Sequence, residues 1–264
     1  MGELRSTIAR VGMWLVLLGL PGALTTSGML LIGTSHASAG TLAGTTGAAI
    51  VDRLIEEIIR DTYETRHYTG RDALSQPVLD TMRSVPRDAF VPADSAVYAW
   101  ENRPLTIGYG QTISQPFIVA LMTDLLETQS SHRILEIGTG SGYQAAVLSS
   151  LVAEVYTIEI IPELAHSAEK RLDALEYHNV SVRSGDGWHG WPEVAPFDGI
   201  IVTAVSPDIP PKLLSQLKIG ARMVIPIGPR YGGQNLTVIV KTEEGYDTSE
   251  VLPVQFVPLT RLPE

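Results

Sequence analysis

The chain has 264 residues, 44% of them hydrophobic, which is enough for the core of one large domain. Its net charge is −10 and it has no block of Lys and Arg, which excludes binding to the nucleic-acid backbone as a main activity. It has no cysteine, which excludes disulfides, thiolate metal sites and cysteine nucleophiles, and its six histidines lack metal-ligand spacing, so we expect no metal.

Residues 1–45 resemble a targeting segment and are not expected to belong to the fold. Two arginines precede an uncharged apolar run over residues 11–33, and Ala37 and Ala39 form the A-x-A arrangement of a signal-peptide cleavage site. The same run reaches the ~20 residues that a bilayer requires, so a membrane anchor is an alternative. A start codon assigned too far upstream is a third explanation.

Residues 46–130 predict a helical region that contains one polar loop. Hydrophobic residues recur at helical spacing in three segments, 48–64, 77–85 and 116–127. The segment between the second and third helices predicts loop structure. Pro116 stands in the first turn of the third helix, where its missing N–H group costs nothing.

The polar loop GYGQTISQPF, residues 108–117, leads directly into this third helix. Gln111, Thr112, Ser114 and Gln115 concentrate uncharged hydrogen-bonding groups there. They could cap the helix. They could also hold an anion, because a helix N-terminus attracts negative charge.

From residue 131 to residue 264 the pattern changes to alternating strands and helices. Strands are expected at 133–137, 155–160, 180–186, 197–205, 221–228 and 236–244, with a seventh in the segment that ends at 260. Helices are expected at 142–152, 162–178 and 210–218. This alternation predicts a doubly wound α/β domain with a mainly parallel, seven-stranded, Rossmann-like sheet.

The turn after the first of these strands, LEIGTGSGY, contains Gly138, Gly140 and Gly142. A dinucleotide-binding turn has its third glycine three residues after the second, where this chain has Tyr143. Glu136, at the end of the strand, would repel a pyrophosphate but suits a cationic ligand that carries an amino group and a sulfonium. A nicotinamide dehydrogenase is therefore disfavoured.

Acidic residues also follow the next two strands. Glu159 ends the second strand, about 20 residues past the glycines, where a carboxylate accepts ribose hydroxyls. Asp186 follows the third strand and can accept from an adenine amino group, and Gly187 lets the base lie close to the backbone. Each acid alone could be an ordinary loop carboxylate. Because the carboxyl ends of parallel strands share one edge, the three acids together predict a site for S-adenosylmethionine.

Several classes of methyltransferase do not fit the chain. The fourth strand ends TAVSPDIPP, without the N/D-P-P-aromatic motif of enzymes that methylate nucleobase amino groups. Cytosine-C5 enzymes need a cysteine, and metal-dependent catechol-type enzymes need a carboxylate cluster that the sequence does not supply. The remaining class is an enzyme whose acceptor needs little activation.

The chain resembles the protein-L-isoaspartate (D-aspartate) O-methyltransferase family over roughly residues 48–262. The resemblance is carried by VPRDAFVP, IGYGQTISQP, LEIGTGSGYQAAVL, GDGWHGWPEVAPFDGIIVTA, LKIGARMVIPIG and FVPLT. The second and last of these segments are not general features of methyltransferases, so the match is specific to this family.

The resemblance implies methyl transfer from S-adenosylmethionine to the free carboxylate of L-isoaspartyl and D-aspartyl residues in damaged proteins and peptides. It implies that Ser114 binds the acceptor carboxylate, in a groove that includes Val257. Donor contacts are implied for Thr112, Ile113, Gln115 and Thr260. A carboxylate is ionised at neutral pH and is already a nucleophile, so neutral donors at this loop would be enough to align it.

We expect a cytoplasmic monomer that binds no nucleic acid, because the donor is made in the cytoplasm. Residues 1–39 make export to the periplasm, or contact with a membrane, the alternative. The competing function is a non-catalytic S-adenosylmethionine-binding module. Such a module would keep the three acids but would have no reason to keep the TISQP loop.

Overall fold

The computed structural model describes residues 40–262. Residues 1–39, which carry the signal-like pattern, lie outside the described part. The chain divides into two units, Met1–Ile50 and Val51–Glu264, and the predicted boundary at residue 130 lies within the second. None of the helices in residues 40–262 has the length and apolar character needed to cross a bilayer.

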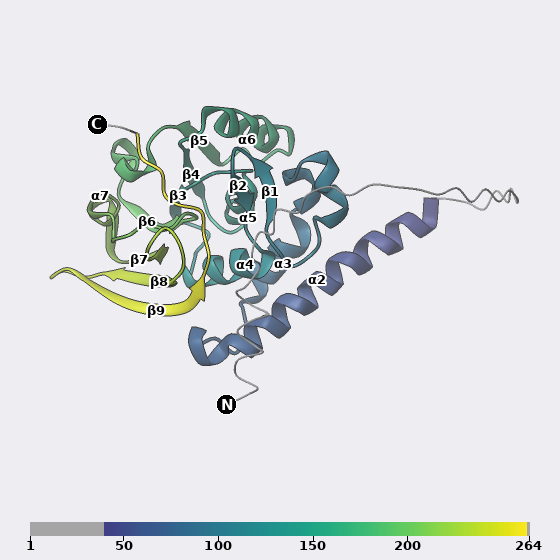
Figure 1. Cartoon of the computed structure of the whole chain (residues 1–264), viewed down its shortest axis with the longest axis horizontal. Helices are drawn as coiled ribbons and strands as arrows, with labels where there is room; N and C mark the ends of the chain where they lie inside the picture. Colours follow the sequence, from purple (N-terminus) through teal and green to yellow (C-terminus); the bar gives the residue numbers. More distant parts are fainter. Residues whose placement is uncertain (1–39, 263–264) are drawn as a thin grey trace, which may run out of the picture. The chain divides into compact units, whose positions relative to one another are not determined.

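The second unit contains a seven-stranded sheet with the order β5-β4-β3-β6-β7-β8-β9 (Figure 1). The strands are β3 (Arg133–Ile137), β4 (Glu154–Glu159), β5 (Val180–Ser184), β6 (Phe197–Val202), β7 (Leu217–Ile227), β8 (Gln234–Lys241) and β9 (Tyr246–Val254). Strands β3 to β7 pair in parallel, and β8 and β9 add to them antiparallel. The predicted fold class is confirmed.

The central strands are apolar because both faces of the sheet are covered. On one face, Leu135 and Ile137 of β3 join a core that includes Leu213 of helix α7 (Pro211–Ser215). Successive residues of a strand point to opposite faces, so Ile134 and Glu136 lie on the other face. There Gly199 of β6 has no side chain, and Ile134 packs into the space that a Cβ would need.

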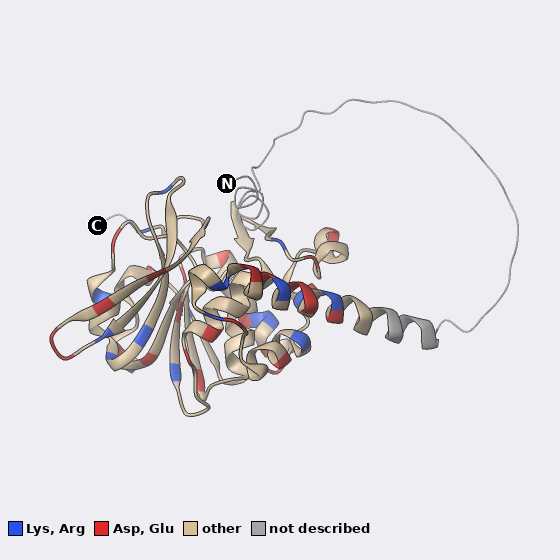
Figure 2. Ribbon diagram, turned by 90° about the horizontal axis from the view of Figure 1, so that it is seen from below, with Lys and Arg blue, Asp and Glu red and all other residues tan. Residues whose placement is uncertain are grey.

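The helices expected before and within the sheet are present. They are α2 (Gly40–Thr69), α3 (Gln76–Ser84), α4 (Pro116–Leu125), α5 (Tyr143–Ser149) and α6 (Pro162–Ala174), together with α7. In α2, Leu54, Ile55 and Ile58 are buried. Basic and acidic residues are mixed along this helix and on the strands visible in Figure 2. Neither charge forms a continuous stripe in this view.

Two regions differ from the sequence-based expectation. The segment predicted as loop before α4 contains a hairpin, β1 (Leu105–Gly108) and β2 (Gln111–Ile113), whose tip has positive φ at three successive residues including Tyr109. The seventh strand, β9, ends at Val254. Residues 255–260 then run back along the edge of the sheet, with one bridge between Val205 and Pro258.

Candidate functional site

The candidate site lies at the carboxyl edge of β3, β4 and β6. Strand β3 is the point where the chain changes direction across the sheet, with β4 on one side and β6 on the other. Ligands of doubly wound folds bind at this switch point. A cavity of about 540 Å³, part of it open to solvent, lies here. It is lined by Gln111, Thr112, Ile137, Gly138, Gly140, Ile158, Glu159, Ile160, Gly187, Thr203, Ala204 and residues 257–260.

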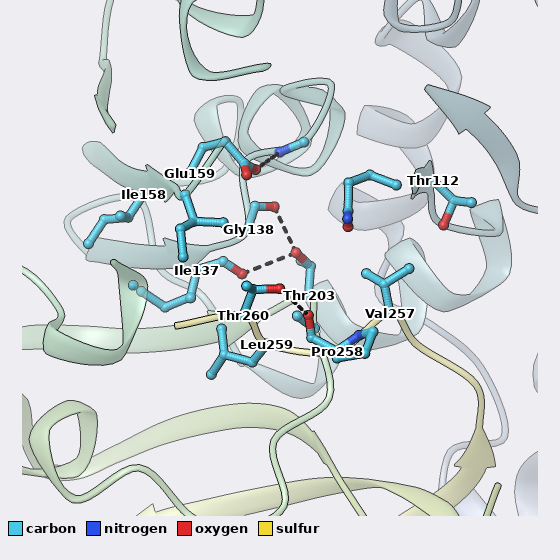
Figure 3. A pocket seen from close by; sticks show the side chains of 15 residues that line it. Thr112, Ile137, Gly138, Ile158, Glu159, Thr203, Val257, Pro258, Leu259 and Thr260 are labelled. Carbon is cyan, nitrogen blue, oxygen red and sulfur yellow. Dashed lines mark hydrogen bonds between the residues drawn. The ribbon is translucent and has the colours of Figure 1, made fainter. Parts of the chain in front are cut away.

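The glycine turn brings its backbone directly to the cavity. Gly138 has a φ of +97°, and a Cβ there would stand 2.4 Å from the hydroxyl oxygen of Thr203. That hydroxyl donates to the carbonyl of Gly138 at 2.7 Å, so β6 holds the turn that follows β3 (Figure 3). Only glycine fits this close approach of two strand ends.

Glu136 is completely buried beneath the turn, and neither of its carboxylate oxygens has a hydrogen-bond partner. Burial raises the pKa of this carboxyl to about 8. The Thr157 hydroxyl opposes this rise in pKa, and the charge of Glu159 adds to it. A buried, unpartnered acid is costly unless a ligand compensates it. Glu136 lines a second cavity, so a cationic ligand group placed there would supply the missing partner.

Glu159 lies at the end of β4 and is 5% exposed. One carboxylate oxygen accepts from the Gly140 N–H at 2.8 Å, and the other accepts from the Ile161 N–H at 3.0 Å. Each carboxylate oxygen can accept a further hydrogen bond. The side chain faces the cavity from the side opposite Thr112, where it can accept ribose hydroxyls (Figure 3).

The residues after β5 divide into one that lines the cavity and one that does not. Gly187 lines it, and a Cβ there would stand 2.4 Å from Ile137, so glycine permits close approach. The Asp186 carboxylate accepts from the N–H groups of Trp188, at 2.9 Å, and Leu262, at 3.1 Å. It caps a short helix, η3 (Gly187–His189), and fastens the C-terminal segment to it.

The polar loop before α4 borders the second cavity. Thr112, Ile113 and Ser114 line it, as does Glu136. The other lining residues are Val119, Gly138, Thr139, Gly140, Ser141, Tyr143, Gln144 and Thr203. Four residues, Thr112, Gly138, Gly140 and Thr203, line both cavities, so the two spaces adjoin.

The N-terminus of α4 does not use Ser114 as its cap. The N-cap residue is Gln115, whose side chain makes no capping hydrogen bond. The N–H of Phe117 instead donates to the side-chain oxygen of Asn102 at 3.0 Å, and Asn102 donates to Asp61 at 2.8 Å. A residue from a distant loop therefore caps this helix, and the Ser114 hydroxyl is left out of that role.

The segment 255–260 closes the lower side of the cavity in Figure 3. The carbonyl of Val257 accepts from the Val205 N–H at 2.8 Å, which ties the segment to the end of β6. The buried side chain of Gln234 accepts from the Phe256 N–H and donates to the Phe256 carbonyl. Val257 and Thr260 are thereby held against the cavity.

Most of the sequence-predicted residues meet around these two adjoining cavities. They are Thr112, Ile113, Ser114, Glu136, Gly138, Gly140, Glu159, Gly187, Val257 and Thr260. Three others do not line either cavity: Gln115 is the N-cap of α4, Gly142 turns the chain into α5 against Leu172, and Asp186 is engaged as described above. Their roles in ligand binding stay predictions.

Sequence reasoning missed Thr203, Gln144 and Asn102, and it named Gln111 only as part of the polar loop. The predicted fourth strand, 197–205, included Thr203, but β6 ends at Val202, so Thr203 lies where the strand ends and where ligands bind. Gln144 donates to Thr123 of α4 at 2.9 Å and so links α5 to the helix behind the polar loop. The capping contact of Asn102 joins residues 15 apart and has no local sequence signal.

The site suits a donor with a cationic end and a nucleoside end. Glu136 supplies an unpartnered buried carboxyl, Glu159 supplies a carboxylate beside the glycine turn, and Gly187 supplies a close backbone surface. Within residues 40–262 no three His, Cys, Asp or Glu side chains gather closely enough to hold a metal ion.

Comparison with known proteins gives one consistent result. The family described as protein-L-isoaspartate(D-aspartate) O-methyltransferase (PCMT) matches residues 57–264. Protein-L-isoaspartate O-methyltransferase 2 of Syntrophobacter fumaroxidans is 56% identical over 209 residues, covering 79% of this chain and 85% of that protein. The protein of the same name from a Polaromonas species is 55% identical over 208 residues, covering 78% and 99%.

Solved structures agree. A protein-L-isoaspartate O-methyltransferase structure has a TM-score of 0.68 at 26% identity, covering 80% of this chain and 66% of that chain. A beta-aspartate methyltransferase from Plasmodium falciparum, solved in complex with S-adenosyl-L-homocysteine, has a TM-score of 0.66 at 21% identity, covering 82% and 99%. The second likeness shows the fold.

Proposed function

The chain belongs to the protein-L-isoaspartate O-methyltransferase family, and we propose that the sheet edge described above carries out the family's reaction. The protein is an S-adenosylmethionine-dependent enzyme that methylates the free carboxylate of isoaspartyl residues in damaged proteins, which initiates their repair. Family membership sets aside a non-catalytic binding module.

One observation carries the assignment of the site. Thr112, Gly138, Gly140 and Thr203 border both cavities, so the space beside Glu159 adjoins the space beside Ser114. A donor that spans both would bring its reactive end to the polar loop. The donor supplies an electrophilic methyl group on a sulfonium, and the chain supplies the alignment.

We assign the donor to the acidic and glycine residues. Glu136 accepts from the amino group, Glu159 accepts from the ribose hydroxyls, and the backbone of Gly138 and Gly187 allows close approach. Thr112, Ile113 and Thr260 border the donor from the opposite side. For Asp186 and Gln115 we propose an indirect role in donor binding. Asp186 holds the backbone of η3 and of the C-terminal segment, and Gln115 is the residue at which α4 begins.

We assign the acceptor carboxylate to Ser114, next to Val257. An α-carboxyl has a pKa of about 3.5, so it is ionised at neutral pH and needs no general base. The hydroxyl of Ser114 takes no part in capping α4, so it can donate to the carboxylate without neutralising it as a direct ion pair would. One carboxylate oxygen would form the new bond to the methyl carbon while the bond between that carbon and the sulfonium sulfur breaks. The donor would leave as the neutral thioether S-adenosylhomocysteine, and no proton moves.

Ser114→Ala tests this assignment. Loss of one orienting donor lowers kcat/KM for an isoaspartyl peptide by about tenfold to a thousandfold, while donor affinity, measured by calorimetry, stays near that of the wild type. A matched peptide with a normal aspartyl residue is the substrate control, because its carboxylate sits one methylene away. A fully active Ser114→Ala enzyme would place the acceptor elsewhere.

For the setting of the reaction we propose a monomer in the cytoplasm, with export to the periplasm as the alternative that residues 1–39 raise. The family acts on protein substrates, and the donor is made in the cytoplasm. Mass spectrometry of the N-terminus of the native protein decides between the two locations. Light scattering should give a mass close to 28.5 kDa for the full chain, and a dimer mass contradicts the monomer.

A further inference from the structure

Arg87 is a completely buried arginine behind the acceptor loop. It begins the short helix η1 (Arg87–Phe90), inside the VPRDAFVP segment, and its side chain is 0% exposed. The guanidinium donates to the backbone carbonyls of Ala99, of Arg103 at 3.1 Å and of Ser114 at 3.0 Å. One side chain thus fixes three loop segments, and the third is the proposed acceptor residue.

No carboxylate compensates the charge of Arg87. None of the ion pairs within residues 40–262 includes it, and its Nε atom has no hydrogen-bond partner. Burial lowers the pKa of the guanidinium to about 10, so it remains charged at neutral pH. Its nearest ring contact is Tyr143, with the guanidinium 5.8 Å from the ring centroid.

A buried guanidinium without a carboxylate partner lowers the stability of the fold, so folding by itself does not explain Arg87. A buried charge without a partner destabilises a protein, and apolar replacements of similar volume are often neutral or stabilising. Three carbonyl acceptors satisfy the hydrogen-bonding groups only in part, since Nε is left over. The position of this cation needs another explanation.

The acceptor site supplies one. Tyr143 and Ser114 both line the second cavity, so Arg87 contacts two residues that border the space where the acceptor carboxylate binds. That space adjoins the cavity that Glu159 lines, and the charge of the Glu159 carboxylate opposes entry of a further negative charge. A direct ion pair would weaken the nucleophile, whereas a cation one peptide unit away would attract the carboxylate and leave its oxygen free to react.

We propose that Arg87 is a positioning residue of the methyl transfer: its bond to the Ser114 carbonyl holds the acceptor loop, and its uncompensated charge favours entry of the acceptor carboxylate. The inference rests on the proposed role of Ser114. The two contributions affect different kinetic constants, because the charge acts on acceptor binding and the alignment acts on turnover.

Two substitutions separate these contributions. Arg87→Met removes the charge and the hydrogen bonds, and should raise the KM for the isoaspartyl peptide about tenfold while also lowering kcat. Arg87→Lys keeps the charge but cannot reproduce the planar fork to three carbonyls, so KM should stay within about threefold and kcat should fall about tenfold. Donor affinity, measured by calorimetry, should change little in either variant.

Arg171→Met is the matched control. Arg171 is a partly buried arginine that, like Arg87, donates to a backbone carbonyl, here that of Ser141 in the glycine turn at 2.8 Å. Its loss should weaken donor binding more than acceptor binding, the reverse of the Arg87→Met pattern. A general loss of stability would instead impair donor and acceptor binding alike in Arg87→Met and Arg171→Met. Thermal melts show the temperature range in which each variant stays folded, and the assays are made within it.

The outcomes decide the inference whether or not Arg87→Met folds. Unchanged kcat in folded Arg87→Lys overturns the positioning role. A rise in the KM of Arg87→Lys to about tenfold overturns the charge role, even where Arg87→Met does not fold. Ser114→Ala, assayed in parallel, distinguishes failure of the Arg87 role from failure of the proposed acceptor site. If Ser114→Ala is impaired while the Arg87 variants are not, only this inference fails; if Ser114→Ala is fully active, the acceptor site itself is misassigned.

Discussion

Glu136 should exchange a proton when the donor binds, and Glu136→Gln should abolish that exchange. The carboxyl is completely buried, has no hydrogen-bond partner and has a pKa of about 8. At pH 7 it is therefore about nine-tenths protonated. A cationic amino group beside it favours the ionised form, so donor binding should release close to one proton from the wild-type enzyme.

The magnitude follows from the same pKa. Each pKa unit corresponds to about 1.4 kcal/mol, so donor affinity should rise by up to about tenfold per pH unit between roughly pH 5.5 and 7.5. Above this range the donor's own amino group begins to lose its charge, since α-amino groups titrate near ~7.7–8.0. Calorimetry in buffers of different ionisation enthalpy measures the released proton directly, and Glu136→Gln should show neither the release nor this slope.

Stability gives an independent check, with a definite sign. The pKa of Glu136 is raised on folding from 4.5 to about 8, so its contribution to stability is full below pH 4.5 and is lost as pH rises toward 8. Ligand-free Glu136→Gln should therefore melt above the wild type at pH 8, and the difference should shrink toward pH 4.5. Wild-type binding without proton release, or identical pH profiles for the two proteins, would refute the assignment.

Two further substitutions test the donor and capping contacts. Glu159→Ala removes the acceptor for the ribose hydroxyls and also for the N–H groups of Gly140 and Ile161, so donor affinity should fall about tenfold to a hundredfold; unchanged affinity by calorimetry would put the ribose elsewhere. Asn102→Ala removes the cap of α4 and should cost about 1 kcal/mol in a denaturation experiment, whereas Ser114→Ala should leave stability nearly unchanged; the opposite ranking would make Ser114 the cap.

The sheet could be predicted from the sequence because its signals are local. A short apolar run such as RILEI, followed by a glycine turn and a helical pattern, identifies a strand and its crossover without any knowledge of distant contacts. The order of strand ends along one edge then brings Glu136 and Glu159 together by topology alone. This is why both carboxylates could be placed at this edge from the sequence, while their contacts with a donor stay predictions.

The hairpin β1–β2 could not be predicted in the same way. Its strands are only three or four residues long, and its tip contains Tyr109 at a φ of +54°, a conformation that tyrosine rarely adopts. Asp186 shows a second limit. Its position after β5 suggests a ligand contact, but the chain returns 76 residues later and the Leu262 N–H donates to its carboxylate.

The capping of α4 depends on contacts that no local pattern contains. A helix N-terminus and a run of hydroxyl and amide side chains fit a cap and an anion site equally well. The two roles separate only because Asn102, held by Asp61 of α2, reaches the Phe117 N–H from another loop. Once that donor is satisfied from outside, Ser114 is released from capping, and its carbonyl is instead held from behind by Arg87. A loop whose backbone is fixed by distant side chains can present its own hydroxyl to a substrate, as the proposed role of Ser114 requires.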